Sequence, residues 1–430
     1  MRMLVIGSGG VGESIVQAIT KRKNAEEWLE LVVLGNRTKK RGDRVIEKLS
    51  ALQDRFVSEC VDASSVKSIA DLAKRYNIDL IMDAASPKVT NNIFDAAYEA
   101  GCNYINMGTW SRPDTKNEGY LEFMTEYNFN RHEQWKEKGL TAILGLGIDP
   151  GVVDVFAKFG AKHLFDTIEE IHVKDGNNLQ VEGMDISFGF NVWTVLDEVM
   201  NPNVEWDSEK GYVIEQPFAG EEIFDFPESI GSQKLVKVEH EETVFMPRFL
   251  KEYGLKKCTF KIALDESLIN ALKVVTQLGL RNLDKIDVGG VMVSPRDVVA
   301  AAAPQPKDLG DNMKGKMCVG VDMYGIKDGM KRNVFMYQIF DNEESMEKYG
   351  CQAVVAQTGL GAAIGIELLA RKIWNEPGVY SPEFFDPEVY LMLMKEYDFT
   401  YMISERDSEY KRSVDIEEMK KIFDGIEKTA

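Results

Sequence analysis

The chain opens with a short apolar strand that runs directly into a glycine-rich turn. Met3–Ile6 is apolar, a helix-forming run follows at Glu13–Ile19, and the residues between read Gly7-Ser8-Gly9-Gly10-Val11-Gly12. Strand, G-x-G-x-x-G turn and helix in this order form the dinucleotide-binding fingerprint. Gly7 permits the tight turn, Gly9 lets a pyrophosphate approach the backbone, and Gly12 lets the helix pack on the strand. The helix start favours an anion, so this opening predicts a bound dinucleotide.

The first 148 residues alternate short apolar strands with helices of ten or more residues. This pattern is typical of a parallel, doubly wound sheet with helices on both faces. Six strands match the dinucleotide-binding, or Rossmann, form of that fold. The expected strands are Met3–Gly7, Leu31–Asn36, Phe56–Asp62, Leu80–Ala84, Asn103–Asn106 and Thr141–Gly145.

The pattern of strands alternating with helices ends at Asp149-Pro150-Gly151. Alternating segments such as Glu169–Val173, Asp185–Phe190 and Thr259–Ala263 favour a mixed sheet in a second, α+β domain. The later segment Gln352–Ile373 has helical character although it contains three glycines, which suggests close approach of another backbone or a ligand.

Composition excludes several classes of function. The 430 residues carry a net charge of −19, which argues against nucleic acid as a partner. No run of about 18 apolar residues and no secretory leader are evident, so we expect no membrane partner and a cytoplasmic location. The five cysteines and four histidines show no metal-ligand spacing, so we expect no metal.

The segment after the second predicted strand points to NADP, with NAD as the less favoured coenzyme. NAD-binding proteins usually carry an acidic residue there, whereas this chain has Asn36, Arg37 and Thr38. Four more cations follow at Lys39, Lys40, Arg41 and Arg44. Cations at a helix start oppose the helix dipole, whereas a guanidinium and a hydroxyl suit a 2′-phosphate.

Residues at the ends of the next three strands are further candidates for contact with the coenzyme. Asp62 and Ala63 follow the third strand, where Asp62 either accepts from the adenine amine or caps the following helix. The other candidates are Ala84, Ala85 and Ser86 after the fourth strand and Asn106 at the end of the fifth.

The segment Gly139–Asp154 resembles the domain-junction motif of the saccharopine dehydrogenase family, and in particular its polyamine branch. Further matches in family order are Phe224–Pro227, His240-Glu241-Glu242, Lys314–Gly320, Gln357-Thr358, Pro377–Val379 and Phe384–Pro387. The resemblance implies a Rossmann domain at 1–148, a substrate domain at 149–350, and C-terminal helices at 351–430 that return to the nucleotide domain. It also implies a homodimer.

The family resemblance implies an NAD(P)-dependent oxidoreductase acting on a carbon–nitrogen bond. Such an enzyme joins a small-molecule amine to a carbonyl compound and reduces the imine, or runs the reverse, on an amino acid or polyamine such as saccharopine or carboxynorspermidine. Two alternatives stay open: a deaminating, lysine-type amino-acid dehydrogenase on the same scaffold, and a sensor that binds NADP without turnover.

Two residues are the candidates for proton transfer. Asp149 follows the last strand of the sheet and either faces the ligand or holds its turn. His240 titrates near neutrality and falls on a family landmark, although a lone histidine is more often structural. For substrate binding we expect Trp110, Arg112 and Trp193, with Arg112 as a possible clamp on a carboxylate. Their alternative roles are core filling and surface exposure.

Overall fold

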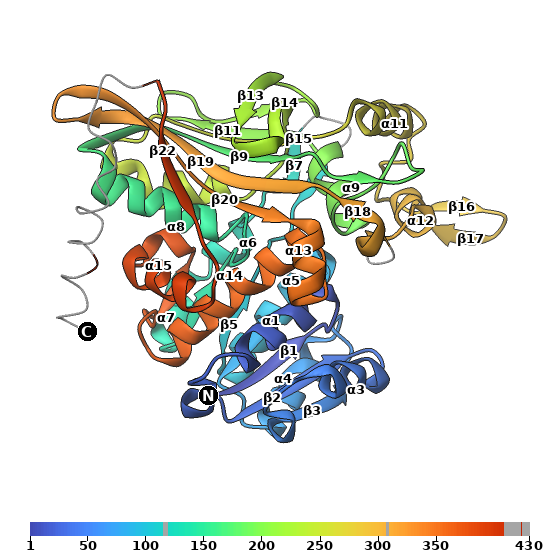
Figure 1. The fold of residues 1–430 in the computed structure, drawn as a ribbon. Coiled ribbons are helices and arrows are strands. Elements are labelled where there is room, and N and C mark those ends of the chain that lie inside the picture. The colour runs from blue at the N-terminus through green and yellow to red at the C-terminus, as the bar shows by residue number, and fades with distance from the viewer. Residues whose placement is uncertain (115–118, 307–308, 408–422, 424–430) are drawn as a thin grey trace.

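The computed structural model describes residues 1–114, 119–306, 309–407 and 423. Six strands from residues 1–143 and one from the C-terminal part form a seven-stranded parallel sheet (Figure 1). The strand order is β21-β8-β5-β4-β1-β2-β3. The strands are β1 (Arg2–Ile6), β2 (Leu31–Asn36), β3 (Phe56–Cys60), β4 (Leu80–Asp83), β5 (Asn103–Asn106), β8 (Thr141–Ile143) and β21 (Gly378–Tyr380). All six predicted strands are confirmed, with ends that differ by one or two residues.

Alternate residues of each strand face two separate apolar layers. In β1, Met3 and Val5 belong to one core cluster, whereas Leu4 and Ile6 belong to the other. The first layer is covered by α1 (Gly10–Thr20) and α3 (Lys39–Lys48), and the second by α4 (Val66–Arg75) and α5 (Thr90–Ala100). Helices therefore cover both faces, as a doubly wound sheet requires.

The second half of the chain forms a mixed sheet above the first (Figure 1). Its path is β12-β11-β15-β9-β19-β20-β22, and β15 and β9 are its parallel pair. The strands are β9 (Thr167–Asn177), β11 (Asn203–Asp207), β12 (Gly211–Glu215), β15 (Lys257–Ala263), β19 (Lys316–Lys327), β20 (Met330–Asp341) and β22 (Met402–Glu405). The hairpin β13 (Glu222–Phe226) and β14 (Gly231–Lys237) joins the sheet through β15. The predicted α+β character is confirmed.

One predicted strand is wrong. Residues 185–190 form turns and loop rather than a strand, and they lead into α9 (Val192–Met200). The side chain of Asn191 caps this helix by accepting a hydrogen bond from Thr194 N at 3.2 Å. The alternation of the sequence reflects one buried residue, Phe188, in the approach to the helix cap.

The chain returns to the nucleotide-binding half through its C-terminal part. Strand β21 pairs with β8, and α14 (Ala353–Ala370) packs along α1. The predicted close approach is present, because a Cβ on Gly359 would lie 2.3 Å from Ser14 Oγ and one on Gly361 would lie 2.3 Å from Gly147 O. Helix α14 is long and apolar enough to cross a membrane, but 83% of it is buried, so it is a core helix.

The structure leaves several sequence-based expectations untested. The boundaries at 148 and 350, the homodimer and the cytoplasmic location stay predictions, and most of the C-terminal segment 408–430 lies outside the described residues.

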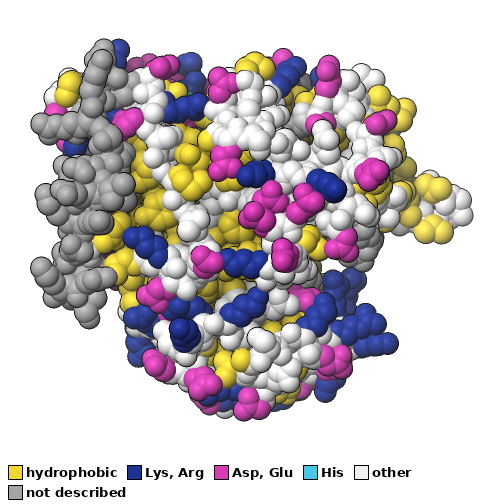
Figure 2. Space-filling model, viewed as in Figure 1, with side chains coloured by type: hydrophobic (Ala, Val, Ile, Leu, Met, Phe, Trp, Pro, Cys, Tyr) yellow, Lys and Arg dark blue, Asp and Glu magenta, His cyan; other side chains and the backbone are white. Residues whose placement is uncertain are grey.

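The hairpin of β16 (Ile286–Val288) and β17 (Val291–Val293) projects from the molecule (Figures 1 and 2). Its side chains Ile286, Val288, Val291 and Met292 are half or more exposed.

A buried ion pair fastens α14 to the segment after α1. Arg22 donates to the fully buried Glu367 at 2.9 and 3.1 Å, and Tyr397 Oη donates to the same carboxylate at 2.8 Å. We expect Glu367→Gln to lower the free energy of unfolding by about 3 kcal/mol, because it removes the buried one of the two carboxylates that pair with Arg22 and leaves only the half-exposed Glu396. Urea denaturation measures the change.

Lys67→Met is the matched control for this prediction. Lys67 pairs with Asp71 on the exposed face of α4, and such a pair contributes less than about 0.5 kcal/mol. Equal losses of stability in the two variants would contradict a special role for the buried pair.

Candidate functional site

The glycine turn at the start of α1 has the geometry that a dinucleotide needs. Gly7 has a φ of +96°, and a Cβ there would lie 2.6 Å from Ala84 O. A Cβ on Gly12 would lie 2.1 Å from Gly7 O, so only glycine lets the helix approach the strand this closely. Above Gly9 the nearest atom to an added Cβ is an Arg41 nitrogen at 3.9 Å. The turn is therefore tight on its inner side and open on its outer side.

Two residues predicted to contact the ribose have different surroundings. Asn36 is buried and closes the turn itself, because its Oδ1 accepts from Ser8 N at 2.8 Å and its Nδ2 donates to Ser8 Oγ at 2.9 Å. Arg37 and Thr38 are exposed at the start of α3. Arg41 Nε donates to Ser8 O at 3.2 Å, which places this guanidinium over the glycine turn. Figure 2 shows Lys and Arg side chains gathered where Figure 1 places α3.

The remaining predicted coenzyme contacts line the carboxyl edge of the parallel sheet. Asp62 is exposed and accepts from Ser64 N at 2.9 Å and Ser64 Oγ at 2.7 Å, so it holds its own turn, with Ala63 beside it. Ala84 lies against Gly7, and Ala85 N donates to Asp83 at 3.0 Å, while Ser86 is exposed. Asn106 is buried and accepts from Gly145 N at 2.9 Å, which ties β5 to the end of β8.

Five carboxylates from different segments meet where this edge faces the second sheet. We call them the carboxylate cluster: Asp149, Asp175, Glu198, Glu241 and Glu242. Asp149 precedes α8 (Val152–Phe159), Asp175 lies on β9, Glu198 lies on α9, and Glu241 and Glu242 begin α10 (Glu242–Leu250). Glu241 accepts from Thr109 N at 2.6 Å, and Thr109 follows β5. The cluster therefore lies beside the predicted nicotinamide end of the site.

Among the described residues, no lysine or arginine forms an ion pair with any member of the carboxylate cluster. Burial raises the pKa of Asp149 and Glu198 well above the ordinary range, and neighbouring carboxylates raise both further. Burial also raises the pKa of Asp175 to about 7. Asp175 Oδ1 and Glu242 Oε1 are buried without a hydrogen-bond partner. Burial therefore favours the protonated form of Asp149, Asp175, Glu198 and Glu242, and a bound cation would favour the ionised form.

His240 lies within this group as an uncharged ring. It is buried, stacked on Phe260 with a centroid separation of 3.7 Å, and its Nδ1 contacts Glu242 Oε2. Burial lowers the pKa of His240 to about 4 and raises that of Glu242. The neutral pair therefore has Glu242 donating its O–H to Nδ1. Ligand atoms of His240, Glu241 and Glu242 lie within 4.8 Å of one another, and the expected absence of a metal stays a prediction.

A second group of polar residues behind Glu198 is already neutralised. Arg296 of α12 (Pro295–Ala302) is fully buried, pairs with Asp197, and donates to Asn201 Oδ1 at 3.1 Å. Asn201 donates in turn to Glu239 at 2.6 Å. Arg296 thus engages Asp197 and Asn201, while Glu239 keeps one buried oxygen without a partner, and burial raises the pKa of Glu239 to about 8. Asp197 is therefore paired, and Glu198 is the carboxylate of α9 that neighbours the cluster.

Asp154 and Glu383 form a buried acid pair. Asp154 Oδ2 accepts from Gly151 N at 2.6 Å, whereas Asp154 Oδ1 and both Glu383 oxygens are buried without a hydrogen-bond partner among the described residues. Burial raises the pKa of Asp154, and the nearby charge of Glu383 raises it further. Burial raises the pKa of Glu383 to about 7.

The predicted substrate-binding residues lie at the edge of the junction between the sheets. Trp110 and Trp193 face each other with ring centroids 6.2 Å apart, so the structure brings these two together. Arg112 is half-exposed, and its Nη2 lies 3.7 Å from Asp284 Oδ1. Lys88, which follows β4, lies 4.4 Å from the centre of the Trp193 ring.

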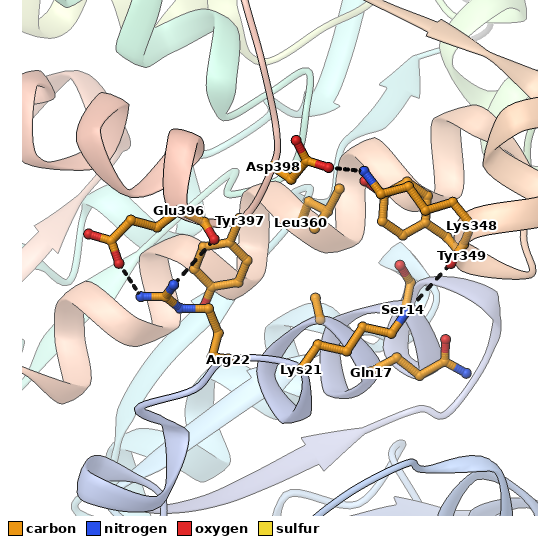
Figure 3. Close-up of a pocket in the computed structure, with 11 residues that line it drawn as sticks. Ser14, Gln17, Lys21, Arg22, Lys348, Tyr349, Leu360, Glu396, Tyr397 and Asp398 are labelled. Atoms are coloured by element: carbon orange, nitrogen blue, oxygen red, sulfur yellow. Dashed lines mark hydrogen bonds and ion pairs between the residues drawn. The ribbon is translucent and has the colours of Figure 1, made fainter.

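A cavity of about 210 Å³ lies elsewhere, between α1, α14 and the end of α15 (Pro387–Glu396) (Figure 3). Its charged residues already have partners: Arg22 pairs with Glu396, and Lys348 pairs with Asp398. It is lined by the face of α1 that turns to α14, and it contains no member of the carboxylate cluster. We assign it no part in the chemistry.

Sequence reasoning missed Asp175 and Glu198 as members of the site. Both lie in elements whose sequence pattern signals only secondary structure, a strand for Asp175 and a helix for Glu198. Their position beside Asp149 depends on long-range packing of β9 and α9 against the first sheet.

Comparison with known proteins gives matches along the chain. Residues 3–143 match the family described as the saccharopine dehydrogenase NADP binding domain, and residues 147–398 match the saccharopine dehydrogenase C-terminal domain. Carboxynorspermidine synthase of Vibrio alginolyticus is 30% identical over 414 residues, which are 94% of this chain and 97% of that protein. Carboxyaminopropylagmatine dehydrogenase of Synechocystis is 26% identical, covering 92% of this chain and 95% of its own.

The fold has a counterpart among solved structures. Saccharopine dehydrogenase (L-Glu forming) from Saccharomyces cerevisiae superposes with a TM-score of 0.67 at 12% identity, covering 94% of this chain and 99% of the yeast chain. At this identity the likeness shows the fold alone.

The buried acid pair predicts a pH-dependent stability. The folded state holds the proton of Glu383 between its ordinary pKa of 4.5 and about 7, whereas the unfolded chain has lost it. The contribution of this group to stability is therefore present below pH 4.5 and is lost as the pH rises towards 7. We expect Glu383→Gln to gain about 2 kcal/mol relative to the wild type between pH 5 and pH 8.

Urea denaturation at several pH values measures this difference. Glu209→Gln, an exposed substitution, is the control and should show no change relative to the wild type across the same range. A Glu383→Gln difference that is independent of pH would show that Glu383 is ionised in the folded protein.

Proposed function

The chain belongs to the saccharopine dehydrogenase family, and from this premise we propose that it joins a cationic diamine or polyamine to a carboxylate-bearing carbonyl compound, with NADP as coenzyme. The family assignment makes it an NAD(P)-dependent oxidoreductase acting on a carbon–nitrogen bond. The observation that carries the choice of amine is the carboxylate cluster without a lysine or arginine partner among the described residues.

The charge of the cluster suits an amine with two positive centres. Burying several carboxylates without counter-ions is unfavourable, and a bound ammonium group relieves that cost by charge-assisted hydrogen bonds. Asp149, Glu198 and Glu241 are half-buried, whereas Glu242 is fully buried and Asp175 nearly so. The cluster thus has a shallow and a deep part, which fits two ammonium groups separated by a short carbon chain. The names of both relatives contain a polyamine.

The proposed reaction is a reductive condensation. The amine nitrogen adds to the aldehyde carbon, water leaves, and the imine carbon gains a hydride while its nitrogen gains a proton. The nicotinamide supplies that hydride when NADPH is bound. For the chain's own residues, burial and neighbouring carboxylates raise the pKa of Asp149, which suits this side chain to give a proton to the nitrogen or to the leaving oxygen. Neutral His240, held by Glu242, fixes the deep part of the cluster.

Three features support NADP over NAD. No carboxylate stands at the end of β2, where the ribose hydroxyls would be recognised, and Asn36 is occupied by Ser8. Arg37 is exposed at the start of α3, and Arg41 lies over the glycine turn. The guanidinium groups of Arg37 and Arg41 suit the 2′-phosphate of NADP, because each carries a positive charge and can donate two parallel hydrogen bonds.

The amine proposal is tested by following NADPH oxidation with pairs of amines and semialdehydes. We expect 1,3-diaminopropane, putrescine or agmatine to give kcat/KM values at least about 100-fold above propylamine, because a second ammonium adds charge-assisted bonds. Glu198→Gln should raise the KM for the diamine about tenfold with a smaller change in kcat. Glu209→Gln serves as the control for loss of a carboxylate.

Other outcomes would overturn this assignment in distinct ways. Preference for glutamate, or equal use of propylamine and diamines, would contradict the cationic-amine site. Reduction of NADP⁺ by lysine alone, with ammonia released, would identify the deaminating dehydrogenase. Tight binding of NADPH without turnover of any amine and carbonyl pair would support the alternative of a sensor that binds NADP without catalysis.

The coenzyme proposal is tested by the ratio of KM values for NADPH and NADH. Arg37→Ala and Arg41→Ala should each raise the KM for NADPH roughly tenfold or more and leave that for NADH nearly unchanged, since each removes a charge-assisted bond. Lys48→Ala, on the last turn of the same helix, is the control. A ratio that is unchanged in both arginine variants would contradict the phosphate assignment.

A further inference from the structure

The proposed reaction places a carboxylate-bearing carbonyl compound next to a group of carboxylates. Like charges repel, so a substrate of this kind requires a cation beside the cluster. Three cationic side chains lie on segments that border the cluster, and they differ in how available they are. They are Lys88, Arg112 and Arg296.

Two of these three are poorly placed for a substrate. Arg296 is fully buried, and Asp197, Asn201 and Arg281 O already engage its guanidinium. Arg112 is 51% exposed and lies near Asp284, which is itself 81% exposed beside the projecting hairpin. Neither offers free donors beside the junction of the two sheets.

Lys88 has a different position. It lies in the short helical turn Pro87–Val89 that follows β4 and the Ala84–Ser86 segment, at the carboxyl edge of the parallel sheet. Its ammonium lies over Trp193 of α9, the helix that also carries Glu198. Its side chain is 34% exposed, so a small molecule can reach it.

The Lys88 ammonium already pairs with a carboxylate of this chain, that of Asp297. Asp297, in the first turn of α12, pairs with the ammonium of Lys88, and the same oxygen accepts from Trp193 Nε1 at 3.0 Å. The Asp297 side chain is 48% exposed, so its displacement exposes it to water rather than burying it unpaired. The Lys88 ammonium and the Trp193 indole N–H together make a donor set for one carboxylate group, and Trp110 stacks beside Trp193.

We propose that Lys88 and Trp193 Nε1 bind the carboxylate of the carbonyl substrate, and that Asp297 occupies this position in the free enzyme. This inference rests on the proposed function. It divides the site into an amine side formed by the carboxylate cluster and a carboxylate side formed by Lys88 and the two tryptophans. The reacting carbon and nitrogen then lie between them.

The test compares a semialdehyde that supports turnover with the aldehyde of equal chain length that lacks the carboxylate. Lys88→Met should raise the KM for the semialdehyde about tenfold or more and leave that for the plain aldehyde within twofold. Lys88→Arg should retain most of the difference. Asp297→Asn should lower the KM for the semialdehyde, because it removes a competing carboxylate. Lys67→Met, on the exposed face of α4, should leave both KM values unchanged.

An ordinary ion pair between the two halves of the molecule gives the opposite pattern. In that case Asp297→Asn and Lys88→Met would raise the KM for both aldehydes alike, and this result would overturn the inference. An unchanged semialdehyde preference in Lys88→Met would overturn it as well. Calorimetric binding of diaminopropane to the Lys88→Met enzyme distinguishes the two proposals: binding at wild-type affinity retains the amine site, whereas no binding by the wild type overturns both.

Discussion

The gathering of five carboxylates where the two sheets meet, two of them buried and three half-buried, is the constraint on which the rest of the structure depends. Asp149 comes from the end of the parallel sheet, Asp175 from the mixed sheet, and Glu198, Glu241 and Glu242 from the helices between them. No lysine or arginine among the described residues pairs with them. Such an arrangement is unfavourable for ionised carboxylates in an apolar interior, and burial accordingly raises the pKa of Asp149, Asp175, Glu198 and Glu242.

The surrounding architecture fixes this group from several directions. Arg296 neutralises Asp197 and orders Asn201, which keeps α9 in register with Glu198 facing inwards. Thr109, beyond β5, binds Glu241 and so connects the second half of the molecule to the edge where the coenzyme is expected. Helix α14 lies between the two sheets and is fastened to the nucleotide-binding half by Arg22 and Glu367 (Figure 1). These contacts hold the carboxylate cluster and the glycine turn on opposite sides of one junction, where we propose that the reaction takes place.

Much of the nucleotide-binding half was predictable from the sequence, because its signals are local. The glycine turn, the six strands and the helices between them follow from short-range patterns, and each strand is confirmed. Strand β21 was not predictable, because three residues pair with β8 from a position more than 230 residues further along the chain. The false strand at 185–190 shows the reverse case, in which alternation near a helix cap imitates a strand.

The functional site was only partly predictable for the same reason. Asp149 and His240 were identified from the loop that follows a strand and from a family landmark, and both lie in the group of buried titratable residues. Asp175, Glu198 and Lys88 join that region through tertiary packing, which no spacing in the sequence records. Asn36 was expected at the ribose, but its amide holds Ser8 instead, and the sequence alone does not distinguish these two uses of an amide.

Proton release on amine binding tests the central claim most directly. Calorimetric titration of the NADP⁺-bound enzyme with diaminopropane at pH 7, in two buffers of different ionisation enthalpy, gives the number of protons exchanged. Carboxyls with raised pKa values ionise when they bind ammonium groups, so net release of protons is predicted, and Glu198→Gln should reduce it. Diamine binding without proton release, or no diamine binding at all, would contradict a buried carboxylate cluster that awaits a cation.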